Sequence, residues 1–200
     1  MYHLAVAKTW VQAHGKRDAD CGANPDMRMM ITGVTGFIGS ALARHLVSQG
    51  HIVLGSSRRA PVQLKHLPPE VKIEPLTLGG HISRRFFDNV DYVIHCAHDF
   101  SQDGLDRNIR GTKDLFERAK ASGTRQQAFV SSYSASKNAV TSYGIAKYQL
   151  ERFFSDRNSL ILKPGLVLGP GGMITVYKAW GIRRQERNVI MRALVSISWI

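Results

Sequence analysis

From residue 29 onward, the apolar residues of this chain alternate between two spacings. Short runs of consecutive apolar residues, typical of strands buried on both faces, alternate with segments in which apolar residues recur every three or four positions, as on one face of a helix. The predicted strands are residues 28–32, 51–55, 71–78, 91–96, 128–132 and 159–163. The predicted helices are residues 37–49, 82–89, 103–121 and 142–156, and residues 60–70, with three prolines, are predicted to form a loop.

This alternation predicts an α/β fold. Six strands joined by right-handed crossovers make a doubly wound parallel sheet of the Rossmann type, whose usual strand order is 3-2-1-4-5-6. In such a sheet the order reverses beside the first strand, and ligands bind at that point, at the carboxyl ends of the strands. We therefore expect functional residues directly after the strands.

Composition and cysteine usage narrow the class of protein. Of 200 residues, 44% are hydrophobic and 21% are charged, which is typical of a globular chain. No apolar run approaches the roughly 18 residues that cross a membrane, and no secretory signal is recognisable. Cys21 and Cys96 have neither a zinc-binding nor a redox-motif spacing. These features favour a cytoplasmic protein without a membrane partner.

The net charge of +12 suggests nucleic acid as a possible partner. The distribution of the charge along the chain argues against nucleic-acid binding. Residues 1–26 are neutral overall, residues 27–172 carry +8, and residues 173–200 carry +4. Basic residues do not form long blocks and are not interleaved with aromatic residues. Nucleic-acid binding therefore stays a remote alternative, and anionic small molecules are the favoured ligands.

Three glycines lie between the first predicted strand and the helix that follows it: Gly33, Gly36 and Gly39. Gly33 would permit a tight turn, Gly36 would let a backbone N–H approach a pyrophosphate, and Gly39 would let the helix pack closely. The helix N-terminus would then face the phosphates with its partial positive charge. A turn that serves packing alone is the alternative.

Tyr143 and Lys147 lie four positions apart on a predicted helix and therefore share one face. An ammonium close to a phenol stabilises the phenolate form, which makes the tyrosine a better base. Ser132 ends the fifth predicted strand, and its hydroxyl could both donate to and accept from a reacting oxygen. Ser131 and Ser134 are rivals for that role, and an exposed Tyr–Lys pair is the structural alternative.

Taken together, these motifs resemble the short-chain dehydrogenase/reductase superfamily, and within it the extended branch of NAD-dependent epimerases and dehydratases. The resemblance covers about residues 28–172. It rests on ITGVTGFIG (31–39), YVIHCAH (92–98), NIRGT (108–112), FVSSYSA (129–135), YGIAK (143–147) and LKPGLVLGPGG (162–172). In the last segment, Lys163 replaces the arginine that is usual in the family.

The resemblance implies roles for individual residues. Tyr143 would be the catalytic acid/base, Lys147 would hold the nicotinamide ribose and favour the phenolate, and Ser132 would orient the substrate oxygen. Asn108 would place the following helix or a water molecule. The predicted cofactor-binding residues are Gly33, Thr35, Gly36, Phe37, Ile38, Gly39, Ser57, Arg58, Arg59, Ala97 and Lys147.

The segment after the second predicted strand favours NADP over NAD. An acidic residue there would bind the 2′-hydroxyl of NAD, but this chain has Ser57, Arg58 and Arg59, which suit a 2′-phosphate. Two solvated arginines are the alternative. The family also has an aspartate near the adenine after the third strand, and residues 76–80 contain none.

The segment His95-Cys96-Ala97-His98 contains three candidate metal ligands. A metal site there is disfavoured, because no fourth ligand has a zinc-like spacing.

The expected domains are an extension (1–26), an NAD(P)-binding Rossmann domain (27–172) and a short basic tail (173–200), with the substrate domain largely missing. The expected function is an NAD(P)-dependent oxidoreductase of the epimerase/dehydratase type, with a nucleotide sugar as a candidate substrate. A cofactor-binding module without turnover is the alternative, and the oligomeric state is not predicted.

Overall fold

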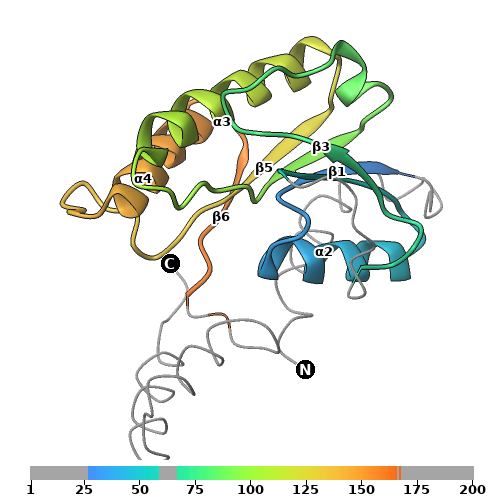
Figure 1. Cartoon of the computed structure of the whole chain (residues 1–200), viewed down its shortest axis with the longest axis horizontal. Helices are drawn as coiled ribbons and strands as arrows, with labels where there is room; N and C mark the ends of the chain where they lie inside the picture. Colours follow the sequence, from blue (N-terminus) through green and yellow to red (C-terminus); the bar gives the residue numbers. More distant parts are fainter. Residues whose placement is uncertain (1–26, 59–66, 166, 168–200) are drawn as a thin grey trace, which may run out of the picture. The chain divides into compact units, whose positions relative to one another are not determined.

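The computed structural model describes residues 27–58, 67–165 and 167. Its strands form one six-stranded, all-parallel sheet in the order β3-β2-β1-β4-β5-β6, as Figure 1 shows. The strands are β1 (Arg28–Thr32), β2 (Ile52–Ser57), β3 (Lys72–Pro75), β4 (Tyr92–His95), β5 (Gln126–Val130) and β6 (Leu160–Leu162). This order confirms the predicted doubly wound, Rossmann-like α/β fold.

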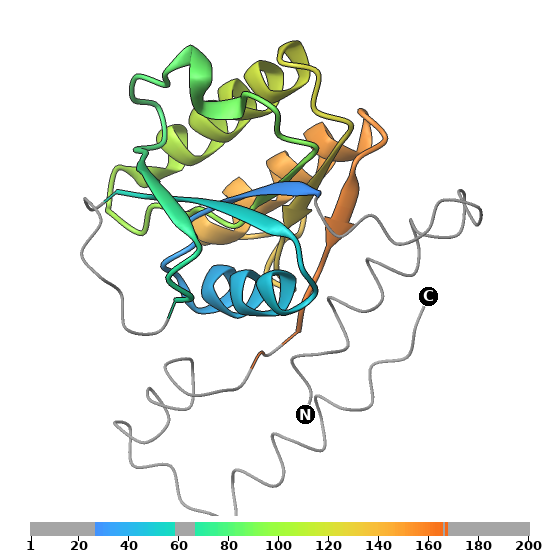
Figure 2. The same ribbon diagram turned by 90° about the vertical axis from the view of Figure 1, so that its right-hand side faces the viewer.

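Helices cover both faces of the sheet. The helical elements are α2 (Phe37–Ser48), the 3₁₀ turn η1 (Arg84–Phe87), α3 (Gly104–Ala121) and α4 (Ser142–Ser155). In Figures 1 and 2, α2 lies on one face, and α3 and α4 lie on the other. Two covered faces are what a parallel sheet with crossover helices requires.

The core explains why the first strand is a continuous apolar run. Met29 and Ile31 pack in one cluster with Leu46 of α2, whereas Met30, which points to the other face, packs with Leu115 of α3. All three β1 residues are fully buried. Because both faces are covered, alternation between apolar and polar residues is not needed.

The ends of several elements differ from the prediction. β3 spans four residues rather than 71–78, because Leu76 and Leu78 turn into the core instead of extending an edge strand, and Gly79 has a φ of +74°. The segment predicted as a helix over residues 82–89 forms only the single turn η1.

Two further strand boundaries differ from the prediction and involve residues of the candidate site. β2 continues to Ser57, since Ser56 and Ser57 pair with Glu74 and Pro75 of β3. β5 begins at Gln126 and ends at Val130, so Ser131 and Ser132 follow the strand rather than ending it. Tertiary pairing, which the local apolar pattern does not record, sets both limits.

The chain divides into two units, Met1–Leu162 and Lys163–Ile200. Every strand and helix that the structure describes belongs to the first unit. The predicted extension (1–26), Arg59 and the predicted tail (173–200) lie outside the described residues. Among the described residues, no helix is both long and apolar enough to span a bilayer.

Candidate functional site

The turn after β1 depends on glycine at two positions. Gly33 has a φ of +68°, and a Cβ there would lie 2.8 Å from the Cα of Ala97. A Cβ on Gly39 would lie 2.5 Å from the Gly33 carbonyl oxygen. Gly36 closes the turn by donating its N–H to the same oxygen at 3.0 Å. The turn therefore packs tightly against both α2 and the segment after β4.

Side chains and backbone groups from the ends of β1, β2 and β4 meet around this turn. The Thr32 hydroxyl oxygen accepts hydrogen bonds from the backbone N–H groups of Cys96 and Ala97, at 3.1 and 3.2 Å. The hydroxyl oxygens of Thr35 and Ser57 lie 3.3 Å apart. The structure thus brings Thr35, Ser57 and Ala97, three predicted cofactor-binding residues, together at the carboxyl edge.

The N-terminus of α2 fits an anionic group. Its N-cap is Gly36, which has no side chain, and the first turn contains no acidic residue. The partial positive charge of the helix end is therefore not neutralised by a side chain of the helix itself. A pyrophosphate placed beside Gly36 would meet backbone N–H groups without a Cβ in the way.

Lys147 is buried below the carboxyl edge of β5, with a relative exposure of 4%. Its ammonium donates to the Val130 carbonyl oxygen at 2.6 Å and lies 5.7 Å from the centroid of the Tyr143 ring. Burial lowers the pKa of Lys147 from 10.5 to about 8. The predicted Tyr143–Lys147 pair is therefore placed on one side of α4, with the ammonium inside the protein.

Aromatic rings surround Tyr143. His98 meets the tyrosine ring edge-on at 4.7 Å between centroids, and Phe100 stacks on it at 5.7 Å with an interplanar angle of 15°. Burial, with a further contribution from the charge of Lys147, lowers the pKa of His98 to about 4. His98 is therefore neutral at pH 7, so the charged group that lies near Tyr143 in this cluster is Lys147.

Ser131 and Ser132, two candidates for the substrate-orienting serine, have different surroundings in the structure. The Ser131 hydroxyl is buried and donates to a carboxylate oxygen of Glu151 at 2.6 Å. Ser132 is half-buried, and its hydroxyl oxygen accepts the backbone N–H of Ser134 at 3.2 Å. Ser131 thus holds α4 against the end of β5, and Ser132 remains the candidate for binding a substrate oxygen.

His95 and Cys96 belong to the core. The His95 Nε2 atom lies 2.8 Å from the Gln127 side-chain oxygen, and burial lowers the pKa of His95 to about 4. Burial raises the pKa of the Cys96 thiol to about 12. Within the described ranges, no three His, Cys, Asp or Glu side chains are grouped so that they could hold a metal ion.

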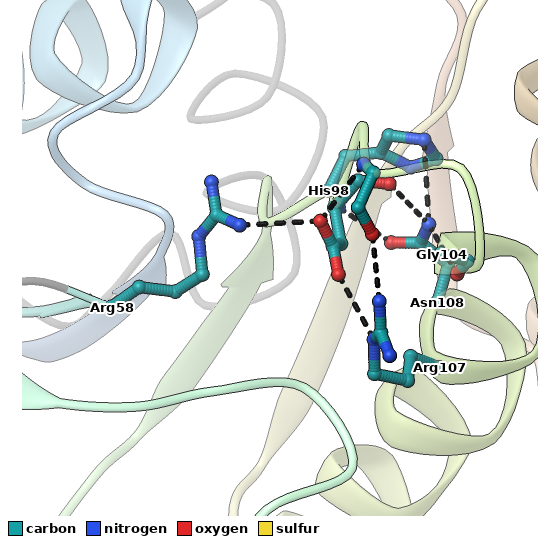
Figure 3. Close-up of polar contacts among 7 residues, drawn as sticks. Arg58, His98, Gly104, Arg107 and Asn108 are labelled. Carbon is teal, nitrogen blue, oxygen red and sulfur yellow. Dashed lines mark hydrogen bonds and ion pairs between the residues drawn. The ribbon is translucent and has the colours of Figure 1, made fainter.

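Asp99 is a site residue that the sequence patterns did not reveal. Its carboxylate accepts hydrogen bonds from Arg58 at 3.1 Å, from Arg107 at 3.0 Å and from the backbone N–H of Ser101 at 3.0 Å. Figure 3 shows Arg58 reaching in from the end of β2 and Arg107 from α3. Arg58, predicted to meet a 2′-phosphate, is thus paired with a carboxylate. An acidic residue just after the strand beside β1 is the signal that could have found Asp99.

The segment Asn108-Ile-Arg-Gly-Thr112 lies within α3 and contacts the segments that follow β4 and β3. The Asn108 side chain donates to the carbonyl oxygens of Asp99 and Gly104, at 2.8 and 2.7 Å, and accepts the Asp99 N–H at 2.7 Å. A Cβ on Gly111 would lie 2.4 Å from the backbone nitrogen of Gly79. Asn108 therefore fixes the start of α3, and Gly111 allows α3 to approach the segment after β3.

Replacement of Lys147 by methionine is expected to remove a pH dependence of stability. Since burial lowers the pKa of Lys147 to about 8, the unfolded state binds a proton that the folded state lacks between about pH 8 and 10.5. The wild-type free energy of unfolding should therefore rise relative to Lys147→Met across this range. Urea denaturation at several pH values measures the difference.

The matched control is Lys120→Met, which removes an exposed lysine of α3. Its stability should run parallel to that of the wild type from pH 7 to 10.5. A Lys147→Met curve that also runs parallel would mean that the ammonium is not buried as the structure shows.

An open parallel sheet with a glycine turn and an uncapped helix N-terminus beside its first strand defines the doubly wound nucleotide-binding class. The model of the NAD dependent epimerase/dehydratase family matches residues 29–179, which is more than half of the sequence. The chain belongs to this family, and the resemblance seen in its motifs is confirmed.

Two curated relatives are reductases by name. The chain is 31% identical to a ceramide reductase of Caulobacter vibrioides over 153 residues, 73% of this chain and 48% of that protein. It is 26% identical to a putative dihydroflavonol 4-reductase of Synechocystis over 184 residues, 76% of this chain and 50% of that protein. The chain thus spans about half the length of these relatives.

A solved structure shares the fold. The UDP-glucuronic acid 4-epimerase from Bacillus cereus, in complex with NAD, superimposes with a TM-score of 0.62 at 20% identity. The alignment covers 72% of this chain and 57% of that protein. At this identity the similarity establishes the Rossmann-like fold and nothing finer.

Proposed function

We propose that this protein is an NAD(P)-dependent oxidoreductase of the epimerase/dehydratase type that acts on a hydroxyl- or carbonyl-bearing carbon. The observation that carries the proposal is the placement of Tyr143 and Lys147. The phenol ring lies at the carboxyl edge of the sheet, and a buried ammonium lies 5.7 Å from its centroid. Family membership and the reductase names of two relatives support the same chemistry.

In this proposal the cofactor lies across the glycine turn. Gly33 and Gly39 allow the tight turn that packs against Ala97 and α2, Gly36 places no side chain at the N-cap of α2, and the N-terminus of α2 would supply N–H groups from Phe37 and Ile38. Thr35, Ser57 and Ala97 would line the same edge, and Arg58, at the end of β2, would hold the adenosine ribose end of the cofactor. The nicotinamide ring, when bound, exchanges a hydride with the reacting carbon.

Tyr143 moves the proton that accompanies this exchange. The phenol donates a proton to a carbonyl oxygen in reduction, and the phenolate accepts one from a substrate hydroxyl group in oxidation. The Lys147 ammonium stabilises the phenolate that reduction leaves. Ser132, which is half-buried beside β5, holds the substrate oxygen by a hydrogen bond.

Two substrate classes have support. A nucleotide sugar is one candidate, because membership of the NAD dependent epimerase/dehydratase family is compatible with such a substrate. An apolar or aromatic ketone is the second, because Phe100 is 77% exposed while it stacks on Tyr143, and Tyr133 next to Ser132 is 59% exposed. Exposed rings beside the reacting group would contact an apolar substrate favourably.

Nucleotide binding tests the first step of the proposal. At a concentration 100 times its dissociation constant, a ligand adds about 2.7 kcal/mol to the free energy of unfolding. We expect NADPH to raise the midpoint of thermal unfolding by several degrees, NADH to raise it less, and a DNA duplex to leave it unchanged. If neither NADPH nor NADH raised the midpoint of thermal unfolding, the proposal would be contradicted.

Turnover tests the second step. NADPH oxidation, followed by absorbance, is expected with at least one ketone from a panel that includes aromatic, long-chain and nucleotide-sugar ketones. Binding of NADPH without oxidation in the presence of any of them would favour the alternative, a cofactor-binding module without turnover.

A further inference from the structure

Two cations share the carboxylate of Asp99 at the edge where the cofactor is proposed to bind. Arg58 comes from the end of β2, Asp99 from the segment after β4, and Arg107 from α3 (Figure 3). The Arg58–Asp99 ion pair therefore connects the segments that follow the two neighbours of β1 in the sheet. The Asp99 side chain is 9% exposed, whereas the Arg58 side chain is 61% exposed. A buried anion therefore holds an arginine that faces solvent.

The carboxylate does not depend on Arg58. Asp99 also accepts hydrogen bonds from Arg107 and from the Ser101 backbone, and its own backbone is bonded at both ends to the Asn108 side chain. The Ser101 N–H, followed by Arg107, keeps the pKa of Asp99 below its usual value, so it is charged at neutral pH. Arg58 can leave while Asp99 stays in place and stays charged.

Arg58 meets Asp99 through one nitrogen, Nη1, at 3.1 Å. A phosphate would bind a guanidinium through two of its donors, with twice the formal charge of a carboxylate. The two anions cannot both approach one guanidinium without repelling each other. The Asp99 carboxylate therefore opposes the binding of a phosphate at Arg58, whereas NAD, which has an uncharged 2′-hydroxyl, does not meet this repulsion.

We propose that Asp99 sets the cofactor preference of this protein by competing with the 2′-phosphate of NADP for the Arg58 guanidinium. The inference rests on the proposed function, because it requires the cofactor ribose to lie beside Arg58. Asp99 is a specificity-determining residue in this view: it holds NADP affinity below what Arg58 alone would provide and leaves NAD affinity nearly unaffected.

The test compares the dissociation constants of NADPH and NADH for the full chain and for Asp99→Asn. Asparagine removes the competing charge and keeps one acceptor oxygen, which can serve either Ser101 or Arg107 but not both, since the two bond to different oxygens of Asp99. We expect NADPH to bind roughly three- to ten-fold more tightly and NADH to change by less than about two-fold, with a smaller NADPH gain at high salt. Asp99→Ser, a second neutral substitution, should shift the ratio in the same direction if the asparagine variant does not fold.

The matched control is Asp106→Asn, which removes an equal charge from α3. Asp106 is 72% exposed and pairs with Arg110, four positions along the helix. Its removal should leave the ratio of NADPH to NADH affinity unchanged. In the Arg58→Gln background, Asp99→Asn should no longer improve NADPH binding, because the group for which the anions compete is gone.

Failure of the competition at Arg58 and failure of the proposed function would give different results. If NADPH and NADH both bind, and Asp99→Asn weakens NADPH binding or leaves it unchanged, competition is refuted while the proposed function stands. An equal gain from Asp106→Asn would also refute it, since only overall charge would matter. If neither dinucleotide binds the wild-type protein, the proposed function fails and the inference fails with it.

Discussion

Replacement of Tyr143 by phenylalanine is expected to lower turnover by about 10²- to 10⁴-fold, the usual contribution of a positioned acid or base. Removal of one oxygen leaves the ring, and with it the stacking on Phe100 and the edge contact with His98. Stability and NADPH affinity should therefore stay close to those of the wild type. Steady-state NADPH oxidation and a thermal unfolding scan provide the two measurements.

Tyr148→Phe is the matched control for this prediction. Tyr148 lies on the same helix but lines a hollow with Lys113 and Phe153, on the side of α4 that faces α3. Loss of its hydroxyl should leave turnover unchanged. A Tyr143→Phe variant that retains full turnover, or a Tyr148→Phe variant that loses as much, would remove Tyr143 from the mechanism.

Gly33→Ala is expected to lower the free energy of unfolding through two separate effects at the glycine turn. A φ of +68° costs an alanine about 1–2 kcal/mol. The new Cβ would also lie 2.8 Å from the Cα of Ala97, and overpacking against backbone adds about 1–3 kcal/mol. Urea denaturation measures the total loss in the free energy of unfolding.

Gly123→Ala separates the two contributions. Gly123 follows α3 with a φ of +85°, and a Cβ there would have no heavy atom within 4 Å. It therefore carries the backbone cost without the clash, and its loss should be smaller by about 1–3 kcal/mol. Equal losses at the two glycines would show that the close approach between the β1 turn and Ala97 does not restrict residue 33.

Local patterns in the sequence predicted β1 and α2 closely, because both have strong, short-range signals. Residues 28–32 are the predicted and the observed first strand, and α2 ends at Ser48 against a predicted end at residue 49. The element ends that were missed depend on partners. Ser56 extends β2 because both Thr32 of β1 and Glu74 of β3 pair with it, Ser57 because Pro75 of β3 does, and Gln126 begins β5 because Tyr92 lies opposite.

The candidate site shows the same division. The spacing of Tyr143 and Lys147 predicted a shared helix face, since that is a local property of the helix. The spacing did not determine that Ser131 would be bonded to Glu151, which left Ser132 as the candidate. It also did not determine that Lys147 would be buried, with its pKa lowered to about 8.

By itself, the sequence determined the fold class, the position of the glycine turn and the order of the motifs along the chain, because these follow from short-range periodicity and residue type. Only the tertiary structure decided which side chains meet at the carboxyl edge. Arg58 and Asp99 are 41 positions apart in the sequence. Their ion pair forms because β2 and β4 are the two neighbours of β1, so that the segments after these strands lie near each other at the carboxyl edge of the sheet. A charge pair formed by strand order leaves no spacing in the sequence from which it could be recognised.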